Sequence, residues 1–598
     1  MTWFCGRKLS YSSGDGEVRA AALHMIIPRH LTSAHDGMKA KAWGASARRC
    51  PMSWSGSRRC VQWAGGVSWG ALCGLSSNVG GVGGSGGGSG DVGGGAGDVL
   101  ALGAAERLFL AMDATTTGAP RATFAITMQY SGGCGAPRLT HDAVVAAVAA
   151  VMAAAPLLTC TAAGRVEVPG DARFVATGTP LPVAAAGVTR EARGDWREVA
   201  VSECRAAFAP GDLLWRVRLV LGAPADDGGP PELSGAAAAA PPALQALVLV
   251  FHHTLTDGRG AARVATLLAA ELAGGRAPAT AVPLVAAADA AGLNVRARVF
   301  DVVAAVVAAV FPRFYAACGN AVVRQAAWVR PLPAGSARPF LMLYDSLADA
   351  GPLAAACRAH KTTVTAAVIA AVHIASATME FAAAGARQAC GGCGGGGSVV
   401  SRVTVPVDVR PRLVPPVDRL ALRVYAVTPM LVAAIRPTDS LWPLAVRARR
   451  QLASVIPAAA RFFGLLSFIK GPWTAALDKG DAQALAAGPR LSVCVSNLGV
   501  VSGAPLPGVA SVHFATMECG ADNCITLGVS STWVPAAGGG GAPCLRTDFA
   551  LSANAAVPRA HAEAYLACVL RCLGDAAGGR EVTAASVRQH GATAATAV

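Results

Sequence analysis

The part of the sequence best suited to chemistry is a pair of histidines, His252 and His253, followed by Asp257 and Gly258. A neutral imidazole titrates near pH 7, so His253 can take a proton from a hydroxyl, thiol or amine and pass it on. Asp257 is too far along a turning loop to be assumed the partner of His253. We interpret it as a carboxylate that fixes the loop and needs a cation from elsewhere. Gly258 allows the chain to turn without a Cβ clash.

The elements on either side of this motif must position it. Residues 244–251 form an almost unbroken apolar run, which predicts a strand buried on both faces. After the motif, apolar residues recur at helical spacing until Gly274 and Gly275 end the pattern. The sequence therefore predicts a strand-to-helix loop. Such a loop suits catalysis, because the rigid strand fixes the imidazole and the loop leaves it open to a substrate.

The segment His252–Gly258 matches the HHxxxDG signature of the chloramphenicol-acetyltransferase-like acyltransferases. This superfamily includes peptide-synthetase condensation domains, wax-ester and diacylglycerol synthases, polyketide-associated acyltransferases and alcohol acetyltransferases. Four more segments resemble those of the family in the same order, and the resemblance covers about residues 100–573; they are Glu106–Asp113, Leu213–Val220, Val405–Arg410 and Val495–Gly499. One departure bears on the subfamily and the acceptor: Ala153–Leu158 lacks the histidine and arginine of the family's HPxLR phrase.

The resemblance implies an α/β fold in which two chloramphenicol-acetyltransferase-like sandwich lobes form a pseudo-dimer around a central tunnel. The mixture of strand and helix patterns in both halves of the chain suits this architecture. Among the predicted strands are residues 401–409 and 420–428. A thioester donor and an acceptor would enter the tunnel from opposite ends, and exclusion of water would protect the thioester from hydrolysis.

The resemblance also implies roles for the motif residues. His253 corresponds to the general base that deprotonates the acceptor. His252, Asp257 and Gly258 correspond to structural members of the loop. The aspartate in relatives pairs with an arginine from elsewhere in the fold, and Arg410 is our candidate, with other arginines as alternatives.

The segment that contains Ser496 and Asn497 supplies the remaining candidates of the site. A hydroxyl or backbone donor near these residues would help to polarise the thioester carbonyl. One such donor contributes on the order of 3 kcal/mol to catalysis.

We therefore expect an acyltransferase that moves an acyl group from acyl-CoA or a carrier-bound thioester to a hydroxyl, the favoured acceptor, or an amine. No metal or other cofactor is required, because the thiolate is already a good leaving group. The partners are a small-molecule donor and acceptor, and an acyl-carrier protein is compatible with this chemistry. Two alternatives remain open: a stand-alone condensation domain that forms amides on carrier-bound substrates, and a scaffold that binds ligands without catalysis.

Composition excludes several other classes of protein. The net charge of +15 is spread along the chain and aromatic residues make up only 6%, which does not favour nucleic-acid binding. The 17 cysteines include one C-x-x-C, Cys390–Cys393, without a second pair at zinc spacing. We expect reduced thiols in an intracellular compartment, with the cytoplasm favoured.

Three apolar stretches are candidates for membrane spans: Ala143–Leu158, Val302–Val310 and Val364–Ala377. Each is short or rich in alanine, whereas a spanning helix needs about 20 strongly apolar residues. We expect no spanning segment, and peripheral contact with a membrane is compatible with a lipid substrate.

Composition along the chain suggests four parts. Residues 1–98 form a basic head that ends in a glycine-rich linker; a plastid or mitochondrial transit peptide, an incorrectly assigned gene start and a disordered tail are the alternatives for it. Residues 99–292 and 293–575 are the predicted N-terminal and C-terminal lobes. Residues 576–598 are expected to be a flexible tail.

Overall fold

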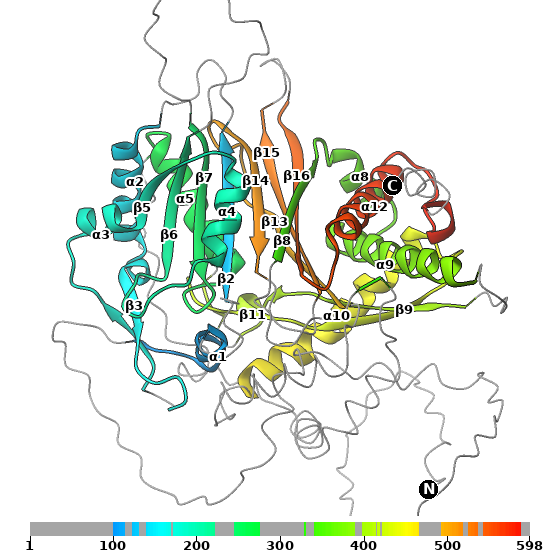
Figure 1. Ribbon diagram of the computed structural model, residues 1–598, viewed down its shortest axis with the longest axis horizontal. Helices are drawn as coiled ribbons and strands as arrows, with labels where there is room; N and C mark the ends of the chain where they lie inside the picture. Colours follow the sequence, from blue (N-terminus) through cyan, green and yellow to red (C-terminus); the bar gives the residue numbers. More distant parts are fainter. Residues whose placement is uncertain are drawn as a thin grey trace, which may run out of the picture. The chain divides into compact units, whose positions relative to one another are not determined.

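Two β-sheets form the centre of this computed structural model, and helices pack on both of them (Figure 1). The structure describes residues 100–113, 122–130, 139–168, 171–221, 244–275, 328–329, 340–388, 397–413, 416–418, 421–465, 492–517, 524–535 and 542–587. All of them belong to one unit of the chain, Val61–Val598. The predicted head, the predicted span and helix at 302–310, and Cys390–Cys393 lie outside the described residues.

The first sheet has the strand order β14-β2-β7-β6-β5, and only its β5–β6 pair is parallel. Its strands are β14 (Val509–Thr516), β2 (Thr123–Tyr130), β7 (Leu244–His252), β6 (Trp215–Leu221) and β5 (Thr189–Arg193). Alternate residues of β7 face two different apolar clusters, for example Leu247 and Val248, so the prediction of a strand buried on both faces is confirmed. The helices that pack on this sheet are α2 (His141–Ala154), α3 (Leu181–Val188) and α5 (Gly258–Leu272) on one side and α4 (Trp196–Arg205) on the other.

The second sheet has the order β12-β9-β13-β15-β16-β8. Its strands are β12 (Met430–Ile435), β9 (Val399–Thr404), β13 (Ser492–Val500), β15 (Ile525–Val534), β16 (Cys544–Asn554) and β8 (Phe340–Leu347). One face packs against four helices: α8 (Gly351–Ala359), α9 (Val364–Gln388), α10 (Leu441–Leu465) and α12 (Arg559–Ala577). Ile525, Leu527 and Val529 point into this core at the two-residue spacing of a strand.

Helix α9 is the one described helix with the length and apolarity to cross a membrane. Most of that window, 72%, is buried inside the protein, because α9 packs against the second sheet and against α10 and α12. The position of α9 in the core of the second sheet thus explains why its sequence is apolar.

Smaller elements complete the described chain. They are β1 (Leu100–Ala101), α1 (Ala104–Asp113), a 3₁₀ turn η1 (Pro156–Thr159), β3 (Cys160–Ala163), β4 (Arg173–Ala176), β10 (Val407–Asp408), a 3₁₀ turn η2 (Arg410–Arg412) and β11 (Ala426–Val427). β1, β4 and β3 form a three-stranded sheet, and β10 pairs with β11.

Strand β14 links the two halves of the sequence, since it belongs to the later half but pairs with β2 in the first sheet. It also packs against β15 of the second sheet. A Cβ on Gly528 would lie 1.8 Å from the backbone oxygen of Phe514, so only glycine permits this approach. The expected division between residues 292 and 293 lies outside the described residues.

Three local expectations need correction. Residues 401–409 are not one strand: β9 ends at Thr404, ahead of Pro406, and Arg410 begins a 3₁₀ turn. Of the predicted strand 420–428, residues 421–428 are described, and of these only Ala426–Val427 form a strand. The described part of the expected tail is packed rather than flexible, because α12 extends to Ala577 and Val582, Ala584 and Val587 lie in the core of the second sheet.

Candidate active site

His253 is the first residue after β7, in the loop that leads into α5. The residue is partly exposed, and its ring stacks on Phe109 of α1 with a centroid distance of 4.3 Å. Phe124 of β2 lies on the ring as well, at 4.7 Å. Burial lowers the pKa of His253 to about 4, although the charge of Asp257 acts in the opposite direction. The ring is therefore neutral at pH 7, the form that accepts a proton.

His252 is fully enclosed and is held at both ring nitrogens. Its Nδ1 accepts a hydrogen bond from the backbone N–H of Thr254, so Nε2 carries the proton and donates it to Asp113 Oδ2 at 2.7 Å. Asp113 is the last residue of α1. Because the ring is committed to these contacts, His252 has a structural position in the loop.

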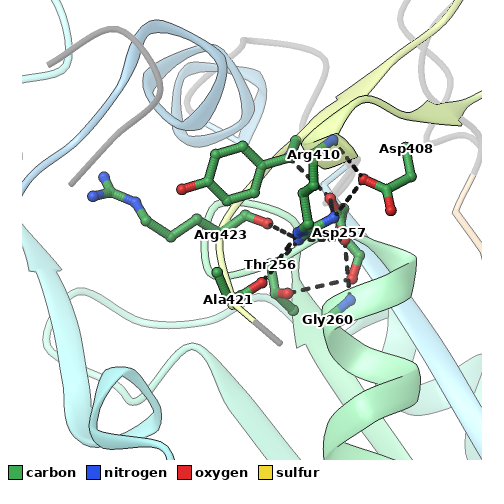
Figure 2. Close-up of polar contacts among 8 residues, drawn as sticks. Thr256, Asp257, Gly260, Asp408, Arg410, Ala421 and Arg423 are labelled. Carbon is green, nitrogen blue, oxygen red and sulfur yellow. Dashed lines mark hydrogen bonds and ion pairs between the residues drawn. The ribbon is translucent and has the colours of Figure 1, made fainter. Parts of the chain in front are cut away.

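Asp257 and Arg410 form a buried ion pair that joins the motif to the second half of the sequence (Figure 2). Arg410 donates to both carboxylate oxygens, from Nη1 at 2.8 Å and from Nη2 at 3.1 Å. Asp257 also accepts the backbone N–H groups of Tyr425 and Gly260, the second of which caps the start of α5. Burial alone raises the pKa of Asp257, but Arg410 and these N–H groups outweigh it and hold the pKa below its usual value.

The guanidinium of Arg410 has no exposed surface and is surrounded by acceptors. It donates to the carbonyl oxygens of Ala421 and Arg423 and to Asp408, and it lies 4.7 Å from the centre of the Tyr425 ring (Figure 2). Arg410 is thus the arginine that the structure places against Asp257. The planar fork explains why an arginine fits here, since lysine cannot make paired contacts of this kind.

A second buried ion pair fixes α1 beside the loop. Arg423 Nε donates to Glu106 Oε1 at 2.7 Å, and the two residues are 317 positions apart in the sequence. The hydroxyl of Thr254 donates to the carbonyl of Glu106. Helix α1, which carries Phe109 and Asp113, is therefore tied both to the motif loop and to the segment that surrounds Arg410.

Gly258 and the segment around Ser496 meet where β13 approaches α5. A Cβ on Gly258 would lie 2.6 Å from Leu498 Cδ2, so close packing requires glycine at this position. Asn497 donates to Thr365 Oγ1 at 3.0 Å and accepts from the backbone N–H of Gly499 at 2.7 Å. Its amide is thus committed to structure, whereas the partly exposed side chain of Ser496 makes no hydrogen bond within the described residues.

Sequence reasoning assigned no role to Asp113, Glu106, Phe109 or Arg423, although the first three lie in a segment that it singled out. Asp113 could have been suspected as an acid near the start of the matching region. Arg423 lies in the predicted strand 420–428, and nothing in its sequence context indicates a role in the site. Within the described ranges no cluster of three or more histidine, cysteine or acidic residues is arranged to hold a metal ion.

Comparison with known proteins identifies the fold. No protein-family profile and no curated protein sequence matches the chain. Solved structures do: the first condensation domain of the calcium-dependent antibiotic synthetase, in complex with a substrate analogue, is 18% identical with a TM-score of 0.51, over 81% of this chain and 99% of that domain. The trichothecene 15-O-acetyltransferase from Fusarium sporotrichioides is 13% identical with a TM-score of 0.51, over 80% of this chain and 94% of the acetyltransferase. The chain therefore has the two-lobed, chloramphenicol-acetyltransferase-like α/β fold of these condensation and acetyltransferase structures.

Proposed function

We propose that the protein is an acyltransferase that moves an acyl group from a thioester donor to a hydroxyl or amine, with His253 as the general base. The observation that carries this proposal is the placement of His253: a partly exposed residue directly after a rigid strand, with an imidazole whose pKa burial lowers, so that the ring is neutral at pH 7. The described fold supports it, because the two similar structures are a condensation domain and an O-acetyltransferase.

In this mechanism the acceptor attacks the thioester directly. Nδ1 of His253 is buried, so Nε2 is the nitrogen that takes the proton from the acceptor hydroxyl or amine. The carbonyl carbon forms a bond to the acceptor, the carbon–sulfur bond breaks, and the proton passes to the thiolate. The rings of Phe109 and Phe124 hold the imidazole of His253 in place. The preceding residue, His252, is held by its hydrogen bond to Asp113.

Ser496 is our remaining candidate for polarising the thioester carbonyl. The hydroxyl of Ser496 makes no hydrogen bond with any described residue. Ser496 lies two residues before Leu498, which contacts the start of α5. The amide of Asn497 would have to give up a hydrogen bond to take this role, so we assign it a positioning role in the turn.

The test is an acyl-CoA transfer assay with alcohols, amines or no acceptor, followed by detection of the free thiol. Thiol release that requires an acceptor supports the proposal, and the acceptor class separates ester from amide formation. His253→Ala should lower turnover by a factor of about 10² to 10⁴ without changing the fold. His360→Ala, a change of an exposed histidine on a different element, is the matched control. Equal turnover of wild type and His253→Ala would exclude His253 as the base.

A carrier-bound donor is the second candidate, since the condensation domain is as similar to this chain as the acetyltransferase by TM-score. The same assay with an acylated carrier protein distinguishes it. Transfer from the carrier but not from acyl-CoA favours the condensation type, and no release from any donor favours a binding scaffold.

A further inference from the structure

We propose that Arg259 and Arg263 of α5 form a binding site for a phosphate group of the thioester donor. This inference rests on the proposed function, because it names a chemical feature of the donor. The two arginines are four residues apart, so their side chains leave the helix on the same face. That helix begins five residues after His253.

The arginine face of α5 runs along the C-terminal end of β13. A methyl group on Gly499 would lie 3.8 Å from Nη2 of Arg259. Thr266, one turn beyond Arg263, donates a hydrogen bond to the carbonyl of Val501 at 3.3 Å. The guanidinium of Arg259 therefore lies at the junction of α5 and β13, next to the loop that carries the proposed base, and Arg263 follows one turn along the same face of the helix.

Among the described residues, no acidic side chain balances the charges of these arginines. Neither side chain forms an ion pair or hydrogen bond with any residue of the described chain, and Nε of Arg263 is buried without an acceptor. The carboxylate nearest in sequence, Asp257, is already held by Arg410. A buried N–H group without an acceptor costs free energy, which an anionic ligand would recover.

Stability of the fold does not explain the pair. Like charges four residues apart disfavour a helix. Cations in the first turns also lie at the end of the helix dipole that favours anions. Arg259 and Arg263 thus oppose the helix that carries them, which is the expected cost of a site that recognises an anion.

The geometry points to phosphate. A guanidinium binds phosphate oxygens through paired, charge-assisted hydrogen bonds, and two such groups on one helix face can share one phosphate. Acyl-CoA and the phosphopantetheine arm of a carrier both contain phosphate, whereas a simple pantetheine thioester does not. A phosphate group is therefore common to acyl-CoA and to the carrier arm. Donors that differ in their phosphate groups can distinguish these two sources.

The experiment compares the Arg259→Ala/Arg263→Ala double variant with wild type on three donors that share one acyl group: acyl-CoA, acyl-4′-phosphopantetheine and acyl-pantetheine. We expect KM for acyl-4′-phosphopantetheine and acyl-CoA to rise about tenfold or more, with kcat and the KM for acyl-pantetheine unchanged. A rise for acyl-CoA alone would assign the site to a phosphate of its nucleotide part. Equal KM changes on all three donors, or none on any, would overturn the proposal.

A control and a binding measurement complete the test. Arg447→Ala/Arg450→Ala removes two exposed arginines from a separate groove on α10 and should leave all three KM values unchanged; a larger effect there than at α5 would also overturn the proposal. Calorimetric titration with CoA itself needs no turnover, so it decides the matter even if the chain transfers no acyl group. We expect wild type to bind CoA with a Kd about tenfold lower than the double variant at equal melting temperature. Equal Kd values, or no binding by wild type, would contradict the site.

Discussion

The ionisation of His253 follows from its place between two aromatic rings at the end of β7. Water is excluded from much of the imidazole, which disfavours the charged form and lowers the pKa to about 4. The neutral ring is the active form of a general base, so activity falls as the pH drops through this pKa. A free imidazole, in contrast, would lose activity near pH 6.5.

This difference predicts the acid side of the pH profile. We expect kcat/KM of the wild type to remain near its plateau down to about pH 5 and to fall with a midpoint near pH 4. Measurement of initial rates after brief exposure to each pH separates this titration from slow unfolding. A midpoint at pH 6.5 or above would show that the ring is solvated in the active protein.

Loss of the buried Asp257–Arg410 ion pair should lower the free energy of unfolding far more than loss of an exposed pair. Arg410→Met would leave the buried carboxylate without its cation and expose no new surface, so we expect the free energy of unfolding to fall by about 3 to 5 kcal/mol. Denaturant titration measures this. Glu563→Gln breaks the exposed pair with Arg559 and should leave the unfolding free energy unchanged. If Arg410→Met changed the unfolding free energy as little as Glu563→Gln does, the stabilising role of the Asp257–Arg410 pair would be wrong.

The sequence predicts the elements that depend on neighbouring residues, but not the contacts between residues that are far apart in the chain. The strand-loop-helix around His253 was predictable, because residues 244–251 are uniformly apolar and the motif follows at once. The pairs His252–Asp113 and Glu106–Arg423 were not, since they join residues 139 and 317 positions apart. Residues 421–425 have strand-like composition, but the carbonyls of Ala421 and Arg423 bond to Arg410 rather than to a neighbouring strand.

At the scale of elements, the approach of β14 to β15 depends on Gly528. Gly528→Ala would place a methyl group 1.8 Å from a backbone oxygen, which cannot move without shifting β14. We expect a loss of roughly 3 kcal/mol or more in unfolding free energy, because both sheets contain the affected strands. Thermal melting of the purified variant is the measurement.

Gly574→Ala is the matched control for this change. A methyl group at Gly574, inside α12, meets no atom within 4 Å, and alanine is the better helix former. We expect an unchanged or slightly raised melting temperature. If Gly528→Ala behaved in the same way, the close approach of the two strands would be wrong.

At the scale of the whole molecule, residues 578–587 complete the core of the second sheet. Val582 and Val587 are buried there, and the backbone of residue 582 accepts a hydrogen bond from Leu441 at the start of α10. Deletion of residues 578–598 should lower the unfolding free energy by roughly 3 to 5 kcal/mol. Deletion of residues 588–598 alone is the comparison, and equal denaturation midpoints for the two truncated proteins would contradict this role.

The position of β14 has a consequence for synthesis of the chain. Until the ribosome has produced residues 509–516, one edge of β2 has no hydrogen-bonding neighbour, although β2, β7 and β6 emerged long before. An open edge of this kind invites pairing with other chains. A fragment that ends at residue 292 should therefore aggregate when expressed alone, and separate supply of the later half should rescue its solubility. The nascent protein has to wait for its own distant sequence before its first sheet is closed.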